Sequence, residues 1–172
     1  MRVLDVGCGS GVFPQSTYNA DRSAKGVGLD IDEAVVRQAK YNIAAWGLND
    51  RFDILPGDIC HPPNETVGPF DLITLYNILY YFHEEDRTEL LRNIRTMLLP
   101  QGVLAVVMNY CSRGKDVGAA NLNMVNCSLK GLTRLPGLDE ITSLLKLCGF
   151  RQIEVHRFVP ESTFYGIVAG NS

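Results

Sequence analysis

Three glycines at alternate positions, Gly7, Gly9 and Gly11, follow an apolar run near the start of the chain. Residues 2–7 are rich in Val and Leu, which predicts a short buried strand, and Pro14 suits the first turn of a following helix. A tight turn between a strand and a helix needs one glycine, or at most two. Glycine lacks a Cβ, so a ligand can approach its backbone closely. Three glycines in this position therefore favour a loop wrapped around a ligand.

Strands and helices alternate along the rest of the chain. The sequence predicts further strands over residues 25–30, 51–56, 70–76 and 103–108, and helices that open near Asp32, His83 and Leu138. The apolar spacing predicts that the helix opening near His83 continues through Leu98 and that Pro100 ends it. A closing β-hairpin is expected from residues 150–155 and 164–169. Because the strands are continuous apolar runs, we expect a doubly wound α/β fold around a mostly parallel sheet.

Composition excludes several classes of protein. The chain has 172 residues, of which 46% are hydrophobic and 20% charged, so we expect residues 1–172 to form one globular domain. Sixteen Lys and Arg against nineteen Asp and Glu give a net charge of −3, which disfavours a nucleic-acid partner. The apolar runs fall far short of the ~20 residues that span a bilayer, and no signal peptide follows Met1. We therefore expect a cytoplasmic protein without a membrane partner.

The sequence predicts no metal site. The five cysteines are scattered, with no CxxC pair, and none is spaced from the three histidines like a zinc ligand, so we expect reduced thiols. No acidic cluster that would form a magnesium site follows the strands over 70–76 and 103–108.

Carboxylates follow two of the predicted strands. Asp30 ends the strand over 25–30, where a carboxylate can accept hydrogen bonds from both hydroxyls of a ribose. Asp30 could instead cap the next helix, but Asp32 is better placed for that role. Asp58 follows the strand over 51–56 at the same edge of the sheet. Alone, Asp58 could be a turn residue, because Gly-Asp is common in turns, but beside Asp30 it favours the same ligand site.

Five segments stand in an order that resembles a known family. They are VLDVGCGSG, VGLDID, GDI, FDLITLYNILYYF and LLPQGVLAVV. In this order and spacing, from residue 3 to about 169, the chain resembles class I S-adenosylmethionine-dependent methyltransferases, most closely small-molecule enzymes of the caffeate and acetylserotonin type. The resemblance implies a Rossmann-like sheet of seven strands with the last one antiparallel, and S-adenosylmethionine as the cofactor.

The resemblance also implies roles for individual residues. The glycine loop would wrap the methionine part of the cofactor, with Asp5 supporting the loop and the cofactor amino group. Asp30 would bind the ribose, with Ile31 beside the adenine. Asp58 would accept a hydrogen bond from the adenine amino group, and Ile59 would lie against the ring. The methionine end would be bound by Gly7, Gly9, Gly11, Leu75 and Tyr76, the last two through their backbone.

The acceptor side carries the candidate catalytic residues, Tyr80 and His83. Enzymes of this type use a histidine as general base shortly after the strand over 70–76. By spacing this position is Tyr80, and His83 lies three residues on. Tyrosine has an ordinary pKa near ~10, which makes it a poor base at neutral pH. Two motifs of other methyltransferases are absent: the Asn/Asp-Pro-Pro-Tyr tetrapeptide of amino methyltransferases and the Pro-Cys pair of cytosine C5-methyltransferases. We therefore expect methyl transfer to an oxygen, nitrogen or carbon of a small molecule.

Two other hypotheses stay open. A methyltransferase-like module could bind the cofactor or a partner protein without turnover, since the expected base is missing. A nucleotide-dependent oxidoreductase is the second, but in the dinucleotide fingerprint GxGxxG the third glycine would fall on Val12.

Two regions bear on the domain organisation. Residues 111–136 mix apolar residues with three asparagines and follow the fifth predicted strand, so we expect an insert that serves either as a lid over the site or as a helix packed on the sheet edge. The family normally has a helical segment before the first strand, and often a dimerisation or substrate-binding domain. We therefore expect either a fragment, lacking an N-terminal domain, or a sheet with one face partly uncovered, and a homodimer is possible.

Overall fold

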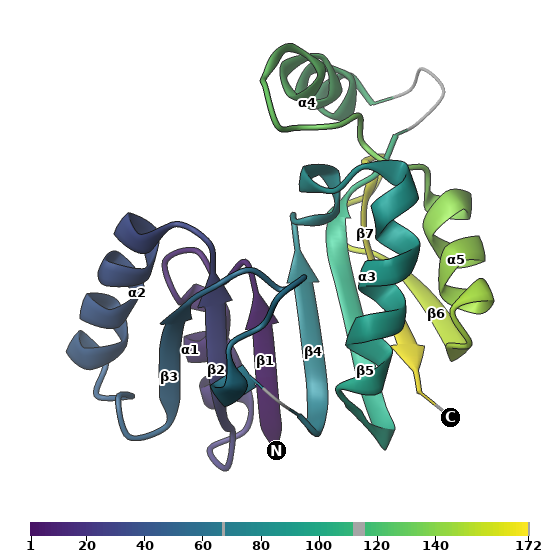
Figure 1. Ribbon diagram of the computed structural model, residues 1–172. Coiled ribbons are helices and arrows are strands. Elements are labelled where there is room, and N and C mark those ends of the chain that lie inside the picture. The colour runs from purple at the N-terminus through teal and green to yellow at the C-terminus, as the bar shows by residue number, and fades with distance from the viewer. Residues whose placement is uncertain (67, 112–115, 172) are drawn as a thin grey trace.

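Seven strands form one sheet in the order β3-β2-β1-β4-β5-β7-β6 within residues 1–66, 68–111 and 116–171, which the computed structural model describes (Figure 1). They are β1 (Arg2–Val6), β2 (Lys25–Asp30), β3 (Phe52–Pro56), β4 (Phe70–Tyr76), β5 (Leu98–Asn109), β6 (Arg151–Arg157) and β7 (Phe164–Gly170). The first five pair in parallel, and β7 lies antiparallel between β5 and β6. The expected doubly wound α/β fold and its closing hairpin are confirmed.

Five α-helices and two short 3-10 turns connect the described strands. They are α1 (Val12–Ala20), α2 (Glu33–Ala45), η1 (Asn64–Thr66), η2 (Leu79–Tyr81), α3 (Glu84–Thr96), α4 (Val117–Ser128) and α5 (Leu138–Leu147). As expected, Asp32 caps α2: its Oδ1 accepts from the backbone N–H of Ala34 at 2.7 Å and of Val35 at 3.3 Å. None of the helices in the described ranges has the length and apolar character that crossing a membrane requires.

Two hydrophobic clusters lie on opposite faces of the sheet. Alternate residues of a strand point to opposite faces of the sheet. One cluster contains Ile73 and Leu104, both fully buried, together with residues of α3 and α5. The other joins Ile54 of β3 to Ala39 and Ile43 of α2. Figure 1 shows α3 in front of the sheet and α1 behind it. This second face is less covered over β4 and β5, where side chains such as Leu72 are half-buried.

The helix that opens at His83 is shorter than the sequence predicts, and the strand after it is longer. The helix ends at Thr96, and β5 begins at Leu98, which pairs with Phe70. The prediction that helical spacing continues through Leu98 was therefore wrong. Leu98 is apolar because it is buried in the sheet, and helical periodicity over so few residues cannot be distinguished from a buried strand.

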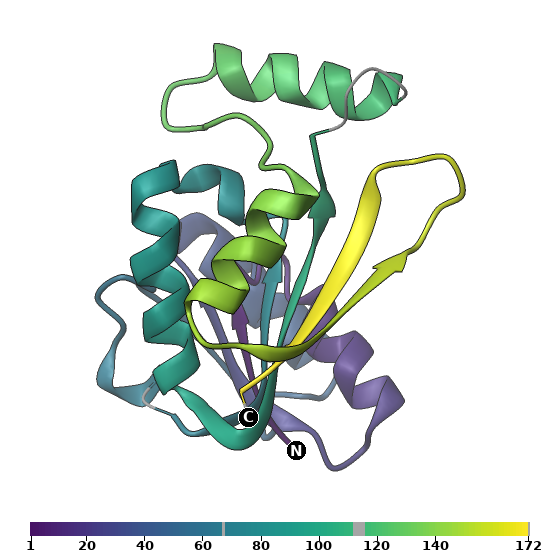
Figure 2. The same cartoon turned by 90° about the vertical axis from the view of Figure 1, so that its right-hand side faces the viewer.

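The insert expected over residues 111–136 contains α4, while residues 112–115 lie outside the described part. Figures 1 and 2 show α4 beyond the carboxyl edge of the sheet, set apart from the other helices. Its N-cap is Asp116, whose Oδ1 accepts from the N–H of Ala119 at 3.0 Å. The other oxygen of Asp116 accepts from the N–H and hydroxyl of Thr163, at 2.6 and 2.8 Å. The start of α4 is therefore tied to the β6–β7 hairpin.

Candidate functional site

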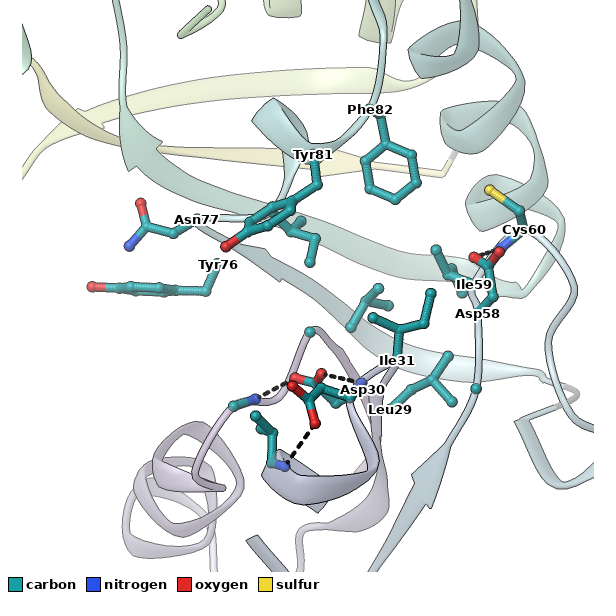
Figure 3. Close-up of a pocket in the computed structure, with 17 residues that line it drawn as sticks. Leu29, Asp30, Ile31, Asp58, Ile59, Cys60, Tyr76, Asn77, Tyr81 and Phe82 are labelled. Carbon is teal, nitrogen blue, oxygen red and sulfur yellow. Dashed lines mark hydrogen bonds between the residues drawn. The ribbon is translucent and has the colours of Figure 1, made fainter. Parts of the chain in front are cut away.

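A cavity of about 730 Å³ opens at the carboxyl edge of the sheet, where β1, β2, β3 and β4 end (Figure 3). Its volume lies within the ~300–1,000 Å³ typical of small-ligand sites. Parallel strands place their carboxyl ends at one edge, so the loops that follow them meet there. The predicted site residues that line the cavity are Gly7, Gly9, Asp30, Ile31, Asp58, Ile59 and Tyr76. Those that do not are Asp5, Gly11, Leu75, Tyr80 and His83.

The glycine loop forms the floor of the cavity between β1 and α1. The N–H groups of Gly7 and Cys8 both donate to the carbonyl of Leu29, at 2.7 and 3.0 Å, which holds the loop against the end of β2. Gly7 has φ +69°, and a Cβ there would collide with Cδ1 of Ile78. Gly9 has φ +53°, and a Cβ there would meet nothing within 4 Å. The loop therefore needs glycine for its backbone conformation, and at Gly9 it leaves open space.

Asp30 connects the glycine loop to the start of α2. Its Oδ2 accepts from the N–H of Gly9 at 3.0 Å, and its Oδ1 accepts from the N–H of Asp32 at 3.1 Å (Figure 3). Each carboxylate oxygen has further acceptor capacity. Asp30 can therefore shape the loop and still accept hydrogen bonds from a ligand.

Asp58 lies across the cavity from Asp30, after β3. Its Oδ1 accepts from the N–H of Cys60 at 2.9 Å, which fixes a turn at this wall. Figure 3 shows Ile31 between the two carboxylates. The Ile31 side chain is 74% exposed, whereas Ile59 is 5% exposed. These two side chains give the cavity apolar surface beside its acceptor groups.

A third wall follows β4, and most of it was missed by the sequence analysis. Besides Tyr76 it is lined by Asn77, Ile78, Tyr81 and Phe82. Asn77 has φ +54°, and its N–H donates to the carbonyl of Val107 at 2.9 Å, so the chain turns sharply away from the sheet. The aromatic run of residues 80–82 is a signal in the sequence, but such a run is equally consistent with core packing.

The two candidate catalytic residues do not reach the cavity. Tyr80 packs against the main hydrophobic cluster, with its ring 5.1 Å from that of Tyr81. Burial raises the pKa of the Tyr80 hydroxyl above its ordinary value, so Tyr80 keeps its proton at neutral pH. His83 is the exposed N-cap residue of α3, and its side chain makes no capping hydrogen bond. Neither residue is placed to act as a base on a ligand in this cavity.

Asp5 is buried beneath the glycine loop. Its side chain is 2% exposed, and its Oδ1 accepts from the Thr74 hydroxyl at 2.7 Å. Burial raises the pKa of Asp5 to about 7; the Thr74 hydrogen bond opposes this shift, and the charge of Asp30 adds to it. Asp5 therefore supports the loop from below and does not line the cavity.

Gly11 and Leu75 also lie behind the cavity surface. Gly11 is the N-cap of α1 with φ +82°, and a Cβ there would face Ile43 and Ala39 of α2. The Leu75 side chain is 1% exposed and belongs to the main hydrophobic cluster, so a ligand could meet only its backbone.

The fold and this cavity together define a class of protein. A strand, a glycine loop and a helix lead into a carboxylate at the end of β2 and another after β3, within a seven-stranded sheet whose last strand is antiparallel. This is the Rossmann-like fold of class I S-adenosylmethionine-dependent methyltransferases. In the part of the chain that the structure describes, no His, Cys, Asp and Glu side chains are grouped as a metal ion would need.

Comparison with known families gives the same assignment. Residues 3–102 match the model of the methyltransferase domain family, and because this match covers more than half of the chain, the chain belongs to that family.

Individual relatives differ in what they are named to act on. The tRNA1(Val) (adenine(37)-N6)-methyltransferase of Phocaeicola vulgatus is 31% identical over 122 residues, 62% of this chain and 50% of that protein. The mitomycin biosynthesis 6-O-methyltransferase of Streptomyces lavendulae is 29% identical over 158 residues, 91% of this chain and 43% of that protein. The chain spans about half the length of the first curated relatives it matches.

A solved structure supports the fold. The mitomycin 7-O-methyltransferase MmcR superposes with a TM-score of 0.86 at 22% identity, covering 99% of this chain and 49% of that one.

Proposed function

We propose that this domain transfers the methyl group of S-adenosylmethionine to a small-molecule acceptor. The observation that carries the proposal is the pairing of Asp30 with the glycine loop: the Asp30 carboxylate holds Gly9 and faces Asp58 across a cavity of ligand size. The low net charge of −3 disfavours a nucleic-acid acceptor. A cytoplasmic location is part of the proposal, and the five free cysteines support it.

The residues present fit this cofactor. The open space at Gly9 marks a backbone that a ligand can approach. Asp30 can accept from the ribose hydroxyls and Asp58 from the adenine amino group, while Ile31 and Ile59 offer apolar surface to the ring. When bound, S-adenosylmethionine supplies a methyl group that is already electrophilic on its sulfonium.

The chain's own residues would then act mainly by positioning. The three walls orient the bound molecules and exclude water, and such positioning can lower a barrier by about 7–11 kcal/mol in favourable cases. Because Tyr80 and His83 do not line the cavity, neither is placed to take a proton from an acceptor bound there. The acceptor atom must therefore be nucleophilic without help from these two residues.

Calorimetry with S-adenosylhomocysteine tests the cofactor site. Asp30→Ala removes an acceptor of ligand hydroxyls and the tie to Gly9, so we expect binding to weaken by about 1.5–3 kcal/mol, the scale of hydrogen bonds to a charged group. Asp53→Ala is the matched control, because Asp53 is an exposed carboxylate on β3 outside the cavity. Equal affinity for wild type and Asp30→Ala, with circular dichroism unchanged, would contradict the proposed site.

Methyl transfer itself needs a second assay. S-adenosylmethionine with an isotopically labelled methyl group, incubated with a panel of phenols, amines and hydroxyquinones, should give labelled product and S-adenosylhomocysteine. Tight cofactor binding without labelled product from this panel or from a tRNA pool would favour a non-catalytic module instead.

A further inference from the structure

Arg87 is a positively charged residue of α3 that is completely buried. Its side chain is 0% exposed and is among the largest fully buried side chains in the described residues. Its Nη1 donates to Glu140 Oε1 of α5 at 2.7 Å. Its Nη2 donates to the Thr133 hydroxyl at 2.8 Å, and its Nε donates to the carbonyl of Leu79 at 3.2 Å. A buried charge is tolerated only when it is paired and hydrogen-bonded, and Arg87 meets this condition.

The partners of Arg87 converge on one short segment, residues 79–82. Arg87 holds the carbonyl of Leu79, and Thr133 holds the next one: both its N–H and its hydroxyl approach the carbonyl of Tyr80, at 2.7 and 3.0 Å. Buried backbone carbonyls need such partners when a turn leaves them outside regular structure. The conformation of this turn is therefore held by the nearby Arg87 side chain and by Thr133, which is 53 residues from Tyr80 in the sequence.

This turn supplies two side chains to the cavity. Tyr81 and Phe82 line its third wall, whereas Tyr80 is partly buried and packs against the main hydrophobic cluster. Figure 3 shows Tyr81 and Phe82 on the opposite side of the cavity from Asp30. A substitution outside the cavity that shifts the backbone of residues 79–82 would thus change the cavity wall, although every residue that lines the wall stays the same.

The same network reaches the insert. Leu135, two residues after Thr133, donates its N–H to Asn123 Oδ1 of α4 at 2.7 Å. Residues 133–135 therefore connect the cavity wall on one side with α4 on the other.

We propose that Arg87 and Glu140 are positioning residues for the cofactor cavity. Their ion pair, in which Arg87 is buried and Glu140 is 26% exposed, extends through Thr133 and holds the turn of residues 79–82 in the conformation that presents Tyr81 and Phe82 to the ligand. The inference rests on the proposed function, because it takes the cavity to be the cofactor site. Neither residue of the pair touches the ligand.

Three variants separate positioning from simple stability. Arg87→Met removes the charge and all four hydrogen bonds of the side chain, Arg87→Lys keeps the charge but cannot reach four acceptors at once, and Thr133→Val removes only the hydroxyl. Arg134→Met is the matched control: Arg134 also pairs with Glu140, at 3.3 Å, but its side chain is 45% exposed and makes no contact with the turn in the described structure.

S-adenosylhomocysteine affinity, measured by calorimetry well below the unfolding midpoint, is the deciding readout. We expect Arg87→Met to weaken binding at least about tenfold, Arg87→Lys and Thr133→Val to fall between it and wild type, and Arg134→Met to bind like wild type. Hydrogen exchange at residues 80–82 and 133–135 should be fastest in Arg87→Met, intermediate in Arg87→Lys and Thr133→Val, and unchanged in Arg134→Met. The amides of β1 and β4 should keep their protection in every variant.

A purely structural role predicts a different result. Arg87→Met and Thr133→Val would then lower the unfolding midpoint but bind the probe within twofold of wild type, and that outcome overturns the inference while leaving the proposed function intact. If wild type itself does not bind S-adenosylhomocysteine, the proposed function fails, and this inference fails with it. If Arg87→Met does not fold, Thr133→Val, which keeps the ion pair, decides the question by the same measurement.

Discussion

At the scale of single residues, Asp5 makes the stability of the fold depend on pH. Burial raises its pKa to about 7 from an ordinary 3.8, so the folded chain binds this proton more tightly than the unfolded chain. The stabilisation is complete below the unfolded pKa and is lost as pH rises through the folded pKa. Between pH 4 and 7 this one group lowers the free energy of unfolding by about 3 kcal/mol. Asp5→Asn stays neutral throughout, so its stability relative to wild type should rise by this amount over that range.

Urea denaturation of both proteins at pH 4.5, 6 and 7.5 measures this difference. Asp53→Asn, which changes an exposed carboxylate on β3, controls for the loss of a negative charge and should run parallel to wild type. Parallel curves for Asp5→Asn and wild type would mean that Asp5 is ionised in the fold at all these pH values.

The sequence could predict those site residues whose positions follow from strand ends. Asp30, Ile31 and Asp58 lie where parallel strands stop, and the parallel sheet brings them to one edge. Tyr81 and Phe82 could not be predicted in the same way. Their direction depends on a turn held by Arg87 and Thr133, and no local pattern records these long-range contacts.

At the scale of elements, α4 is the least firmly packed helix with respect to the sheet. Only Ala119 and Asn126 of its residues are buried, while Val117 is 76% and Met124 65% exposed. Its apolar contact with the main hydrophobic cluster is made by Ala119 and Leu122. Its other ties are polar: the cap at Asp116 and the bond from Leu135 to its Asn123 side chain. We therefore expect its amides to exchange with solvent faster than those of β4 and β5.

Hydrogen exchange with cofactor bound, before and after adding an acceptor mimic, tests whether α4 is a lid. A lid slows its exchange when the mimic is added, and Asp116→Ala, which releases the start of α4 from Thr163, should speed exchange in α4 and at the Thr163 amide. Protection equal to that of β4 before any mimic is present would identify α4 as a fixed part of the core. The sequence predicts this insert and leaves its helix as one of two alternatives, because asparagines weaken helical propensity while the Asp116 cap supports the helix.

At the scale of the whole molecule, a ligand bound in the cavity would contact loops that follow separate strands of the sheet. Its walls come from the loops after β1, β2, β3 and β4, so a bound ligand stabilises the folded state as a unit. At one hundred times the dissociation constant, such binding adds about 2.7 kcal/mol. For a chain of this size that is a rise of about 5–10 °C in unfolding temperature.

We expect this rise in unfolding temperature with S-adenosylhomocysteine and none with NAD at the same concentration. The loop lacks the third glycine of the dinucleotide fingerprint, because Val12 occupies that position at the start of α1, and its side chain is 54% exposed. A scanning fluorimetry titration of both compounds decides between them: a shift with NAD alone would make this cavity a dinucleotide site, and the methyltransferase proposal would be withdrawn.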